Sequence, residues 1–323
     1  MNSIKIFLSI LVSTIAFSCS NSKEKEAALK VDYQIAIGSF QDLTINTDNH
    51  VYALSVILNP NSDTQKLELN KITPDGASTT LYDKNFSSLD MPKITHDSFG
   101  KIYWTDSQQG KIFSFTENQV PYPVYTIQGA TQQENALLFE FSNLDDNTFA
   151  FFDGKLNKFK LFSLNQQTDY VVAGSGNYGV QDGNGLDASF IWITGMKTYN
   201  NAIYTINNYQ YIRKIDCNSA TYNVSTLCNF VNQGTILDLA VDADEVIYAL
   251  VQGKGIFKLI NGEMTLYKDG IEDITSENAI KTSKIDWTSF RKIFIKNNDL
   301  YLVGSTNYFD LTLTKISNFK EKL

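Results

Sequence analysis

The sequence contains few side chains of the kinds that usually carry catalysis. Its two histidines, His50 and His96, are the only imidazoles that could act as general bases or as zinc ligands. A catalytic zinc site usually takes about three protein ligands, and a hydrolase with a nucleophile elbow needs a G-x-S-x-G turn, which this sequence lacks. We therefore assign no catalytic residue, and we expect neither a zinc or copper enzyme nor a serine hydrolase.

A glycine-rich segment at 174–190, GSGNYGVQDGNGLDASF, is a second place where chemistry could occur. Phosphate-binding loops are also rich in glycine, but they lead into a helix, and no helical pattern follows this segment. Loop oxygens suit calcium, so Asp182, Asn184 and Asp187 could bind that ion. We favour a structural turn at Asp182 and Gly183, and we expect no cofactor, with calcium as the alternative. Positive φ angles are expected at Gly174, Gly176, Gly179, Gly183 and Gly185.

Aromatic and amide side chains occur together near the ends of several expected strands. A surface that binds sugars or peptides combines flat apolar faces with amide hydrogen bonds. The candidate ligand-binding residues are Trp192, Asn208, Tyr209, Asn307 and Tyr308. Packing between sheets is the alternative role for each aromatic residue. Asp106, Asp153 and Asn207 follow comparable strands, where we expect their side chains to cap turns.

The three cysteines have different expected roles. Residues 1–18 are typical of a secretory signal peptide, and Ala16-Phe17-Ser18-Cys19 resembles the lipobox of bacterial lipoproteins. That resemblance implies acylation of Cys19, whereas an ordinary signal peptide with an incidental cysteine is the alternative. Export would permit a disulfide between Cys217 and Cys228. If the intervening NSAT forms a hairpin turn, Cys228 lies too far along its strand for this bridge.

The segment that follows Cys19 indicates where the protein is located, and the net charge limits its partners. Residues 19–30 have the composition of a solvated tether, which leaves 31–323 as the folded domain. We expect an outer-membrane lipoprotein, periplasmic or surface-exposed, that contacts the membrane through its lipid only. A formal net charge of −8 without a basic cluster beyond the N-terminus argues against nucleic acid as a partner. A monomer is expected.

The elements that would position these residues recur along the chain. Aromatic residues make up 13% of the sequence, which favours strands over helices. Residues 94–116 contain three strands separated by turns at Gly100 and Gly110, and a fourth strand follows at 123–128. The same order returns in six units that begin near 40, 94, 137, 194, 237 and 290. The second strands are marked by Tyr52, Tyr103, Phe149, Tyr204, Tyr248 and Tyr301.

Six such units predict an all-β protein, a six-bladed β-propeller with four-stranded blades. The last unit, 290–317, lacks a fourth strand, and the apolar segment 31–38 precedes the first complete unit. Placed beside 309–317, this N-terminal strand would complete the sixth blade and close the ring. An open ring would expose unpaired strand edges. A pair of β-sandwiches explains the sixfold recurrence less well.

Residues 171–228 resemble NHL-repeat propellers, and IYWTD at 102–106 resembles the related YWTD propellers. The matching NHL positions are Asp182-Gly183, Ala188, Phe190 and Gly195, whereas Thr194 replaces the usual proline. The resemblance implies that Ala188 and Phe190 plug the space beneath the next blade. NHL-type lyases need several histidine ligands, which this chain lacks. Propeller lactonases place Glu, Asp and Asn around calcium in the central channel, and such clusters have no linear signature.

These observations favour an exported, lipid-anchored propeller that binds a protein or glycan without catalysis. A calcium-dependent, lactonase-like hydrolase with its site in the central channel is the alternative. The two functions differ in whether a carboxylate cluster around the axis of the ring can hold a metal ion.

Overall fold

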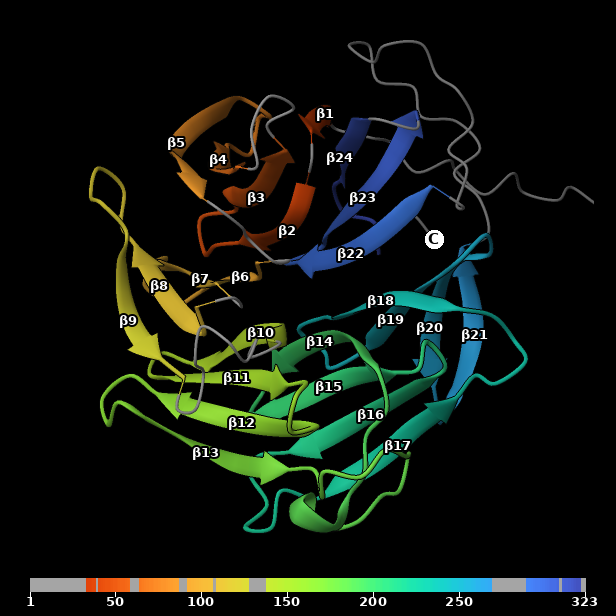
Figure 1. Ribbon diagram of the computed structural model, residues 1–323. Coiled ribbons are helices and arrows are strands. Elements are labelled where there is room, and N and C mark those ends of the chain that lie inside the picture. Colours follow the sequence, from red (N-terminus) through yellow and green to blue (C-terminus); the bar gives the residue numbers. More distant parts are fainter. Residues whose placement is uncertain are drawn as a thin grey trace, which may run out of the picture.

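The chain folds into small antiparallel sheets because its short strands can cover their apolar faces only against neighbouring sheets. The computed structural model describes residues 33–38, 40–58, 64–86, 92–106, 109–127, 138–268, 289–307 and 310–320. Within these ranges, the strands form six four-stranded sheets arranged in a ring (Figure 1). The fold is therefore the expected six-bladed β-propeller. No helix in the described part of the chain is long and apolar enough to span a membrane.

The first three blades follow one another without crossovers. Blade 1 consists of β2 (Phe40–Ile45), β3 (Val51–Leu58), β4 (Gln65–Ile72) and β5 (Ser78–Phe86). Blade 2 consists of β6 (Ile94–His96), β7 (Ile102–Asp106), β8 (Lys111–Phe115) and β9 (Tyr122–Thr126). Blade 3 consists of β10 (Leu138–Asp145), β11 (Thr148–Asp153), β12 (Lys158–Ser163) and β13 (Thr168–Ala173).

The remaining blades repeat this order, with a three-residue 3-10 helix, η1 (Gly185–Asp187), between blades 3 and 4. Blade 4 consists of β14 (Ile193–Tyr199), β15 (Ala202–Asn207), β16 (Tyr211–Asp216) and β17 (Val224–Asn229). Blade 5 consists of β18 (Ile236–Val241), β19 (Ile247–Val251), β20 (Gly255–Ile260) and β21 (Glu263–Lys268). Blade 6 consists of β22 (Phe290–Lys296), β23 (Asp299–Asn307), β24 (Asp310–Ile316) and β1 (Tyr33–Gly38).

The ring is closed by its N-terminal strand. β1 pairs antiparallel with β24, Tyr33 opposite Lys315 and Gly38 opposite Leu311, so the strand order of blade 6 is β1-β24-β23-β22. This confirms the closure expected from 31–38. The first strand of every blade lies nearest the axis, and all six blades run in the same sense (Figure 1). We call the side of the ring where these first strands begin the upper face, and the opposite side the lower face.

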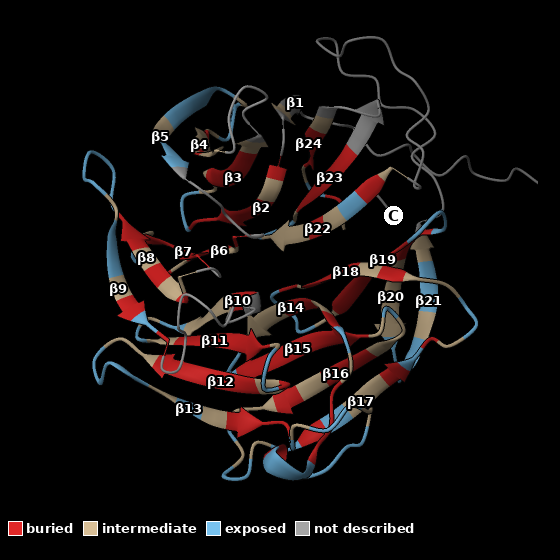
Figure 2. Ribbon diagram, in the orientation of Figure 1, coloured by how far each residue is buried: buried red, intermediate tan, exposed pale blue. Residues whose placement is uncertain are grey.

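The core lies between blades, where sheet faces meet, while the outermost strands carry most of the exposed strand residues (Figure 2). In five blades a tyrosine of the second strand packs against the next blade, and these residues are Tyr52, Tyr103, Tyr204, Tyr248 and Tyr301. The expected sixth member, Phe149, is wrong by one residue. Counted from the strand end at Asp153, Ala150 occupies the tyrosine position and packs toward blade 4, whereas Phe149 faces Tyr103 of blade 2.

Candidate functional site

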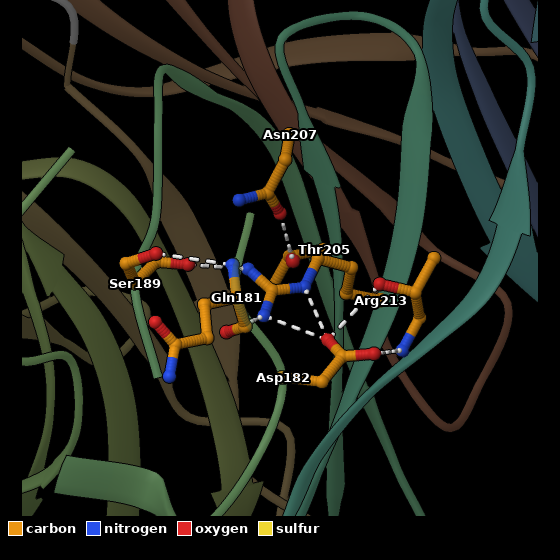
Figure 3. Close-up of polar contacts among 7 residues, drawn as sticks. Gln181, Asp182, Ser189, Thr205, Asn207 and Arg213 are labelled. Atoms are coloured by element: carbon orange, nitrogen blue, oxygen red, sulfur yellow. Dashed lines mark hydrogen bonds and ion pairs between the residues drawn. The ribbon is translucent and has the colours of Figure 1, made fainter. Parts of the chain in front are cut away.

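The glycine-rich loop is fixed to blade 4 by a buried arginine. Arg213, on β16, has no exposed surface, and its Nη1 atom donates to the carbonyl of Ser189 at 2.6 Å (Figure 3). Its Nη2 atom donates to the carbonyl of Gln181 at 2.7 Å and to Asp182 Oδ1 at 2.8 Å. Burial lowers the pKa of Arg213, and the Asp182 carboxylate opposes that shift. The guanidinium therefore ties both ends of the Gln181–Ser189 stretch to one strand.

The Asp182 carboxylate is also held by blade 4. Its Oδ2 atom accepts the backbone N–H of Thr226 at 2.7 Å, and its Oδ1 atom accepts the Thr226 hydroxyl at 3.0 Å. Asp182 therefore joins the loop to β16 and β17. Asn184 precedes η1 and Asp187 is its last residue, and the N–H of Asp187 donates to the carbonyl of Asn184. Among the described residues, no three His, Cys, Asp or Glu side chains form a group that could hold a metal ion.

The glycines of this loop serve two different purposes. Gly174, Gly176 and Gly183 have φ angles of +108°, +89° and +143°, as expected. Gly179 and Gly185 have no positive φ, which corrects the prediction for these two positions. They are needed for close approach, because a Cβ at Gly185 would overlap the carbonyl oxygen of Val172 and one at Gly179 would lie 2.5 Å from Ser189 Oγ.

Once fixed, the loop packs between blades 3 and 4 and then exposes Trp192. Ala188 and Phe190 are completely buried, and Phe190 meets Phe159 edge-on at 4.8 Å, so the loop forms the expected plug. Two residues later, the side chain of Trp192 is 65% exposed on the upper face, directly before β14. Its φ of +40° is an uncommon backbone conformation for a bulky residue.

The turn between β15 and β16 adds a second exposed aromatic residue beside Trp192. The N–H of Asn208 donates to the carbonyl of Trp192 at 2.9 Å, which ties this turn to the start of β14. Asn208 and Tyr209 have φ angles of +51° and +58°, as in a type I′ turn, and Tyr209 is 43% exposed. We call Trp192, Asn208 and Tyr209 the aromatic platform.

Blade 5 shows that the fold does not require aromatic residues at these positions. The N–H of Gln252 donates to the carbonyl of Thr235 at 2.9 Å, the counterpart of the bond between Asn208 and Trp192. Thr235 thus corresponds to Trp192, and Gly253, with a φ of +65°, corresponds to Tyr209. A non-glycine residue held at a positive φ costs on the order of 1–3 kcal/mol, and such backbone strain is found at functional sites. Blade 4 therefore bears strain that blade 5 avoids.

The other sequence candidates lie elsewhere. Asn307 ends β23 in blade 6, away from the platform, and Tyr308 lies outside the described residues, as does Cys19. Asp106 Oδ1 accepts the N–H of Gln109 at 3.0 Å, and Asp153 Oδ1 accepts that of Leu156 at 3.1 Å. Asn207 differs, because its Oδ1 atom accepts the Thr205 hydroxyl and its buried Nδ2 atom has no hydrogen-bond partner among the described residues. Its side chain therefore does not cap the turn.

The two cysteines of blade 4 do not form a disulfide. Cys228 lies opposite Ile212 on β16, whereas Cys217 follows the far end of that strand. They also belong to different cores, because Cys217 packs toward blade 3 and Cys228 toward blade 5. Both thiols are free, so the bridge considered from the sequence is wrong. Burial raises the pKa of the Cys217 thiol to about 12.

Charged side chains alternate in sign around the axis of the ring. Six charged residues, one from each blade, lie on the first strands or just before them in the order Asp42, Lys93, Glu140, Lys197, Asp238 and Lys292. Lys197 is two positions further along its strand than the others, because Gly195 occupies the equivalent position in blade 4. Lys93 Nζ donates to Glu140 Oε1 at 2.9 Å, and Lys197 Nζ lies 3.9 Å from Asp238 Oδ2. Burial opposes the charge on Lys292, but Asp238, Asp42 and Glu140 outweigh it and raise its pKa above the ordinary value.

This layer does not fit a calcium ion. Calcium takes about six to eight oxygen ligands. Asp42 Oδ2 and Asp238 Oδ2 already accept backbone N–H groups, from Ile94 at 3.1 Å and Ile293 at 3.0 Å. Asp238 Oδ1 is buried and has no hydrogen-bond partner among the described residues, but a single available oxygen does not provide the ligands that calcium requires. Any divalent cation here would also face the neighbouring ammonium groups.

A half-buried histidine, His96, at the lower end of these strands makes stability depend on pH. Burial and the charge of Lys296 lower the pKa of His96 to about 4, and its Nδ1 atom lies 2.7 Å from the Thr44 hydroxyl. The unfolded chain takes up this proton near pH 6.5, whereas the folded protein does so only near 4, so stability falls as pH drops through that window.

We expect His96→Asn to remove about 2 kcal/mol of the stability difference between pH 7 and pH 5, measured by urea unfolding at both values. Comparing the pH dependence of the unfolding free energy in wild type and variant cancels the contribution of the carboxyl groups, which titrate in both proteins. Identical pH dependence in the two proteins would show that His96 is not held neutral.

Comparison with known proteins supports the fold alone. No family model matches this sequence, and no curated protein matches it. Among solved structures, a gluconolactonase from Xanthomonas campestris has a TM-score of 0.57 at 10% identity, covering 88% of this chain and 88% of that chain. Virginiamycin B lyase from Staphylococcus aureus has a TM-score of 0.54 at 13% identity, covering 88% and 99%. A streptogramin B lyase gives 0.51 at 12%, covering 88% and 98%.

Two functional features were missed by reasoning from the sequence. Arg213 is one of only two arginines in the chain, and it stands within the apolar strand pattern YIRKID. A lone arginine on a strand whose neighbours are buried is a signal for a buried ion pair. The charged layer around the axis carries no such local signal, because its members are about 50 residues apart and meet only when the ring closes.

Proposed function

We propose that this protein is an exported lipoprotein, anchored through Cys19 in the outer membrane, whose propeller binds a protein or glycan ligand on the aromatic platform without transforming it. The observation that carries the proposal is the pair of exposed aromatic residues, Trp192 and Tyr209, held in strained backbone conformations. At the corresponding places blade 5 has Thr235 and Gly253 and keeps the same hydrogen bond between the turn and the first strand, so blade 4 maintains the aromatic faces for a reason other than folding.

The chemistry of the platform suits a ligand with both apolar and hydrogen-bonding surface. Indole and phenol rings stack on sugar rings or on peptide side chains, and Asn208, in the same turn as Tyr209, adds an amide. The platform stands on a rigid support, because Trp192 follows a loop pinned by Arg213 and Tyr209 lies in a tight turn. Little conformational entropy is then lost on binding.

The direction of β1 predicts which face would point away from the membrane. β1 runs antiparallel to β24, and β24 runs parallel to β22, so β1 begins on the lower face. A tether that ends before Tyr33 would therefore leave the ring on the side opposite the platform. An anchored propeller of this kind would present Trp192 and Tyr209 outward, where a ligand can reach them.

The alternative is a calcium-dependent, lactonase-like hydrolase with its site at the axis. Asp42, Glu140 and Asp238 do converge there, and Asp238 Oδ1 has no hydrogen-bond partner among the described residues. Interleaved Lys93, Lys197 and Lys292 balance these carboxylates, which makes a cation site unfavourable. Binding at the platform is therefore the better supported function.

Screening of the purified protein against glycan and peptide arrays tests the proposal, with each bound probe recovered and analysed by mass spectrometry. We expect retention of an unmodified probe, with and without a chelator. Release of a hydrolysed product in a calcium-dependent manner would instead support the hydrolase.

A further inference from the structure

The described residues of blades 1 and 2 line a cavity between the outer parts of these two blades. Blades diverge toward the periphery, so the space between their outer strands must be occupied by large side chains. Tyr125 and Phe162 stack at 3.9 Å between blades 2 and 3, and Phe190 of the plug fills the next wedge. Between blades 1 and 2, the Tyr82 and Trp104 rings are in contact, with centroids 5.9 Å apart, and both line a cavity of about 340 Å³.

The walls of this cavity, which we call the blade 1–2 cleft, are aromatic and apolar. Trp104 and Phe113 are stacked, with planes 15° apart and centroids at 6.0 Å, and Tyr82 faces them from β5. Val120 and Pro121 form one lip, and the Val120 side chain is 82% exposed. The size falls within the range of small-ligand sites, and flat walls of this kind accept one ring.

Positive charge lies at the upper end of the same cleft. Lys84 and Lys111 line it from opposite blades, against one carboxylate, Asp106. Gln109 bridges two of these groups, since its amide donates to Asp106 Oδ2 at 2.8 Å and its Oε1 atom accepts from Lys111 Nζ at 2.9 Å. The hydrogen bond to Gln109 orients the Lys111 side chain. It uses one of the three N–H donors of the Lys111 ammonium group. In a chain of net charge −8, this cleft is locally cationic.

We propose that the blade 1–2 cleft binds an organic anion consisting of one six-membered ring that bears a carboxylate. The ring would lie against Trp104, Phe113 and Tyr82, and the carboxylate would lie between Lys84 and Lys111. Two sources share this chemistry, a uronic acid of a glycan and an aryl carboxylate. The cleft lies between blades 1 and 2 and shares no residue with the aromatic platform of blade 4, so this binding is independent of the proposed function.

Titration calorimetry of the whole protein with four probes tests the ligand class. Glucuronate and benzoate carry both ring and carboxylate, glucose carries the ring alone, and acetate carries the carboxylate alone. We expect at least one of the two ring carboxylates to bind about tenfold or more tightly than glucose and acetate. The preferred ring carboxylate distinguishes the sources. Binding of glucose as tightly as glucuronate, or no binding of either ring carboxylate at about 10 mM, would overturn the proposal.

Charge variants locate the binding. Lys84→Gln together with Lys111→Gln should weaken the bound ring carboxylate about tenfold or more, while Lys258→Gln on blade 5 should leave it unchanged. Val120→Asp at the exposed lip should also weaken it, and Val120→Asn should not, a pair that perturbs no buried residue. Trp192→Thr should have no effect. Unchanged affinity in the double lysine variant and in Val120→Asp would contradict the assignment.

Discussion

A chain that begins at Phe40 instead of Lys30 should lose roughly 3–5 kcal/mol of unfolding free energy and should associate in solution. Removing β1 deletes a ladder of five residue pairs with β24 and uncovers the edge of blade 6. Ile37, which packs between blades 6 and 1, is lost with it. Urea unfolding and light scattering of the two chains measure both effects.

The chain that begins at Lys30 is the control, since it retains all of β1 and should match the full domain in stability. Equal unfolding midpoints for the two chains would mean that closure by β1 contributes nothing, and that the ring is held by inter-blade packing alone.

Arg213→Met should destabilise the protein by about 3 kcal/mol and loosen the loop at 174–192. Methionine fills similar space but leaves the carbonyls of Gln181 and Ser189 without their donor in a buried place. It also removes the cation stacked 4.7 Å from the Phe190 ring. Urea unfolding gives the loss of stability, and hydrogen exchange across 174–192 shows where it falls.

Lys214→Met, at the next position on β16, is the matched control, because Lys214 is partly exposed and lies outside this network. We expect its effect to stay within about 0.5 kcal/mol. If Arg213→Met behaved like this control, the loop would be held by its plug residues, and Arg213 would not position the platform.

The architecture could be predicted because its determinants are local and repeated. Each unit carries its own turns and apolar strands, and only the unpaired segment 31–38 could supply the strand missing from the sixth blade. The single register error arose in TFAFFD, where three phenylalanines surround Ala150 and spacing alone does not show which side chain faces which blade. The structure decides this through the strand end at Asp153.

The site was predictable only in part. Trp192, Asn208 and Tyr209 were found because exposed aromatic and amide residues beside a turn are a local signal. The buried Arg213 network, the close approach at Gly185 and the charged layer depend on contacts between distant segments, which spacing does not reveal. The separation of Cys217 and Cys228 likewise depends on the register of β16 with β17, where Cys228 lies opposite Ile212.

The most direct test gives blade 4 the residues of blade 5. The double variant Trp192→Thr/Tyr209→Gly replaces both aromatic faces with the residues of blade 5, where Thr235 has no positive φ and only Gly253 does. Because glycine relieves the strained position 209, the variant should be as stable as wild type or more stable, by up to roughly 1 kcal/mol.

The decisive measurement is binding of wild type and this double variant to the same glycan and peptide arrays, with calorimetry on the strongest probe. We predict that the affinity falls about tenfold or more while the unfolding midpoint is retained, because exposed Trp and Tyr side chains dominate such interfaces. Undiminished binding by the folded double variant would contradict the account and place the ligand elsewhere on the ring.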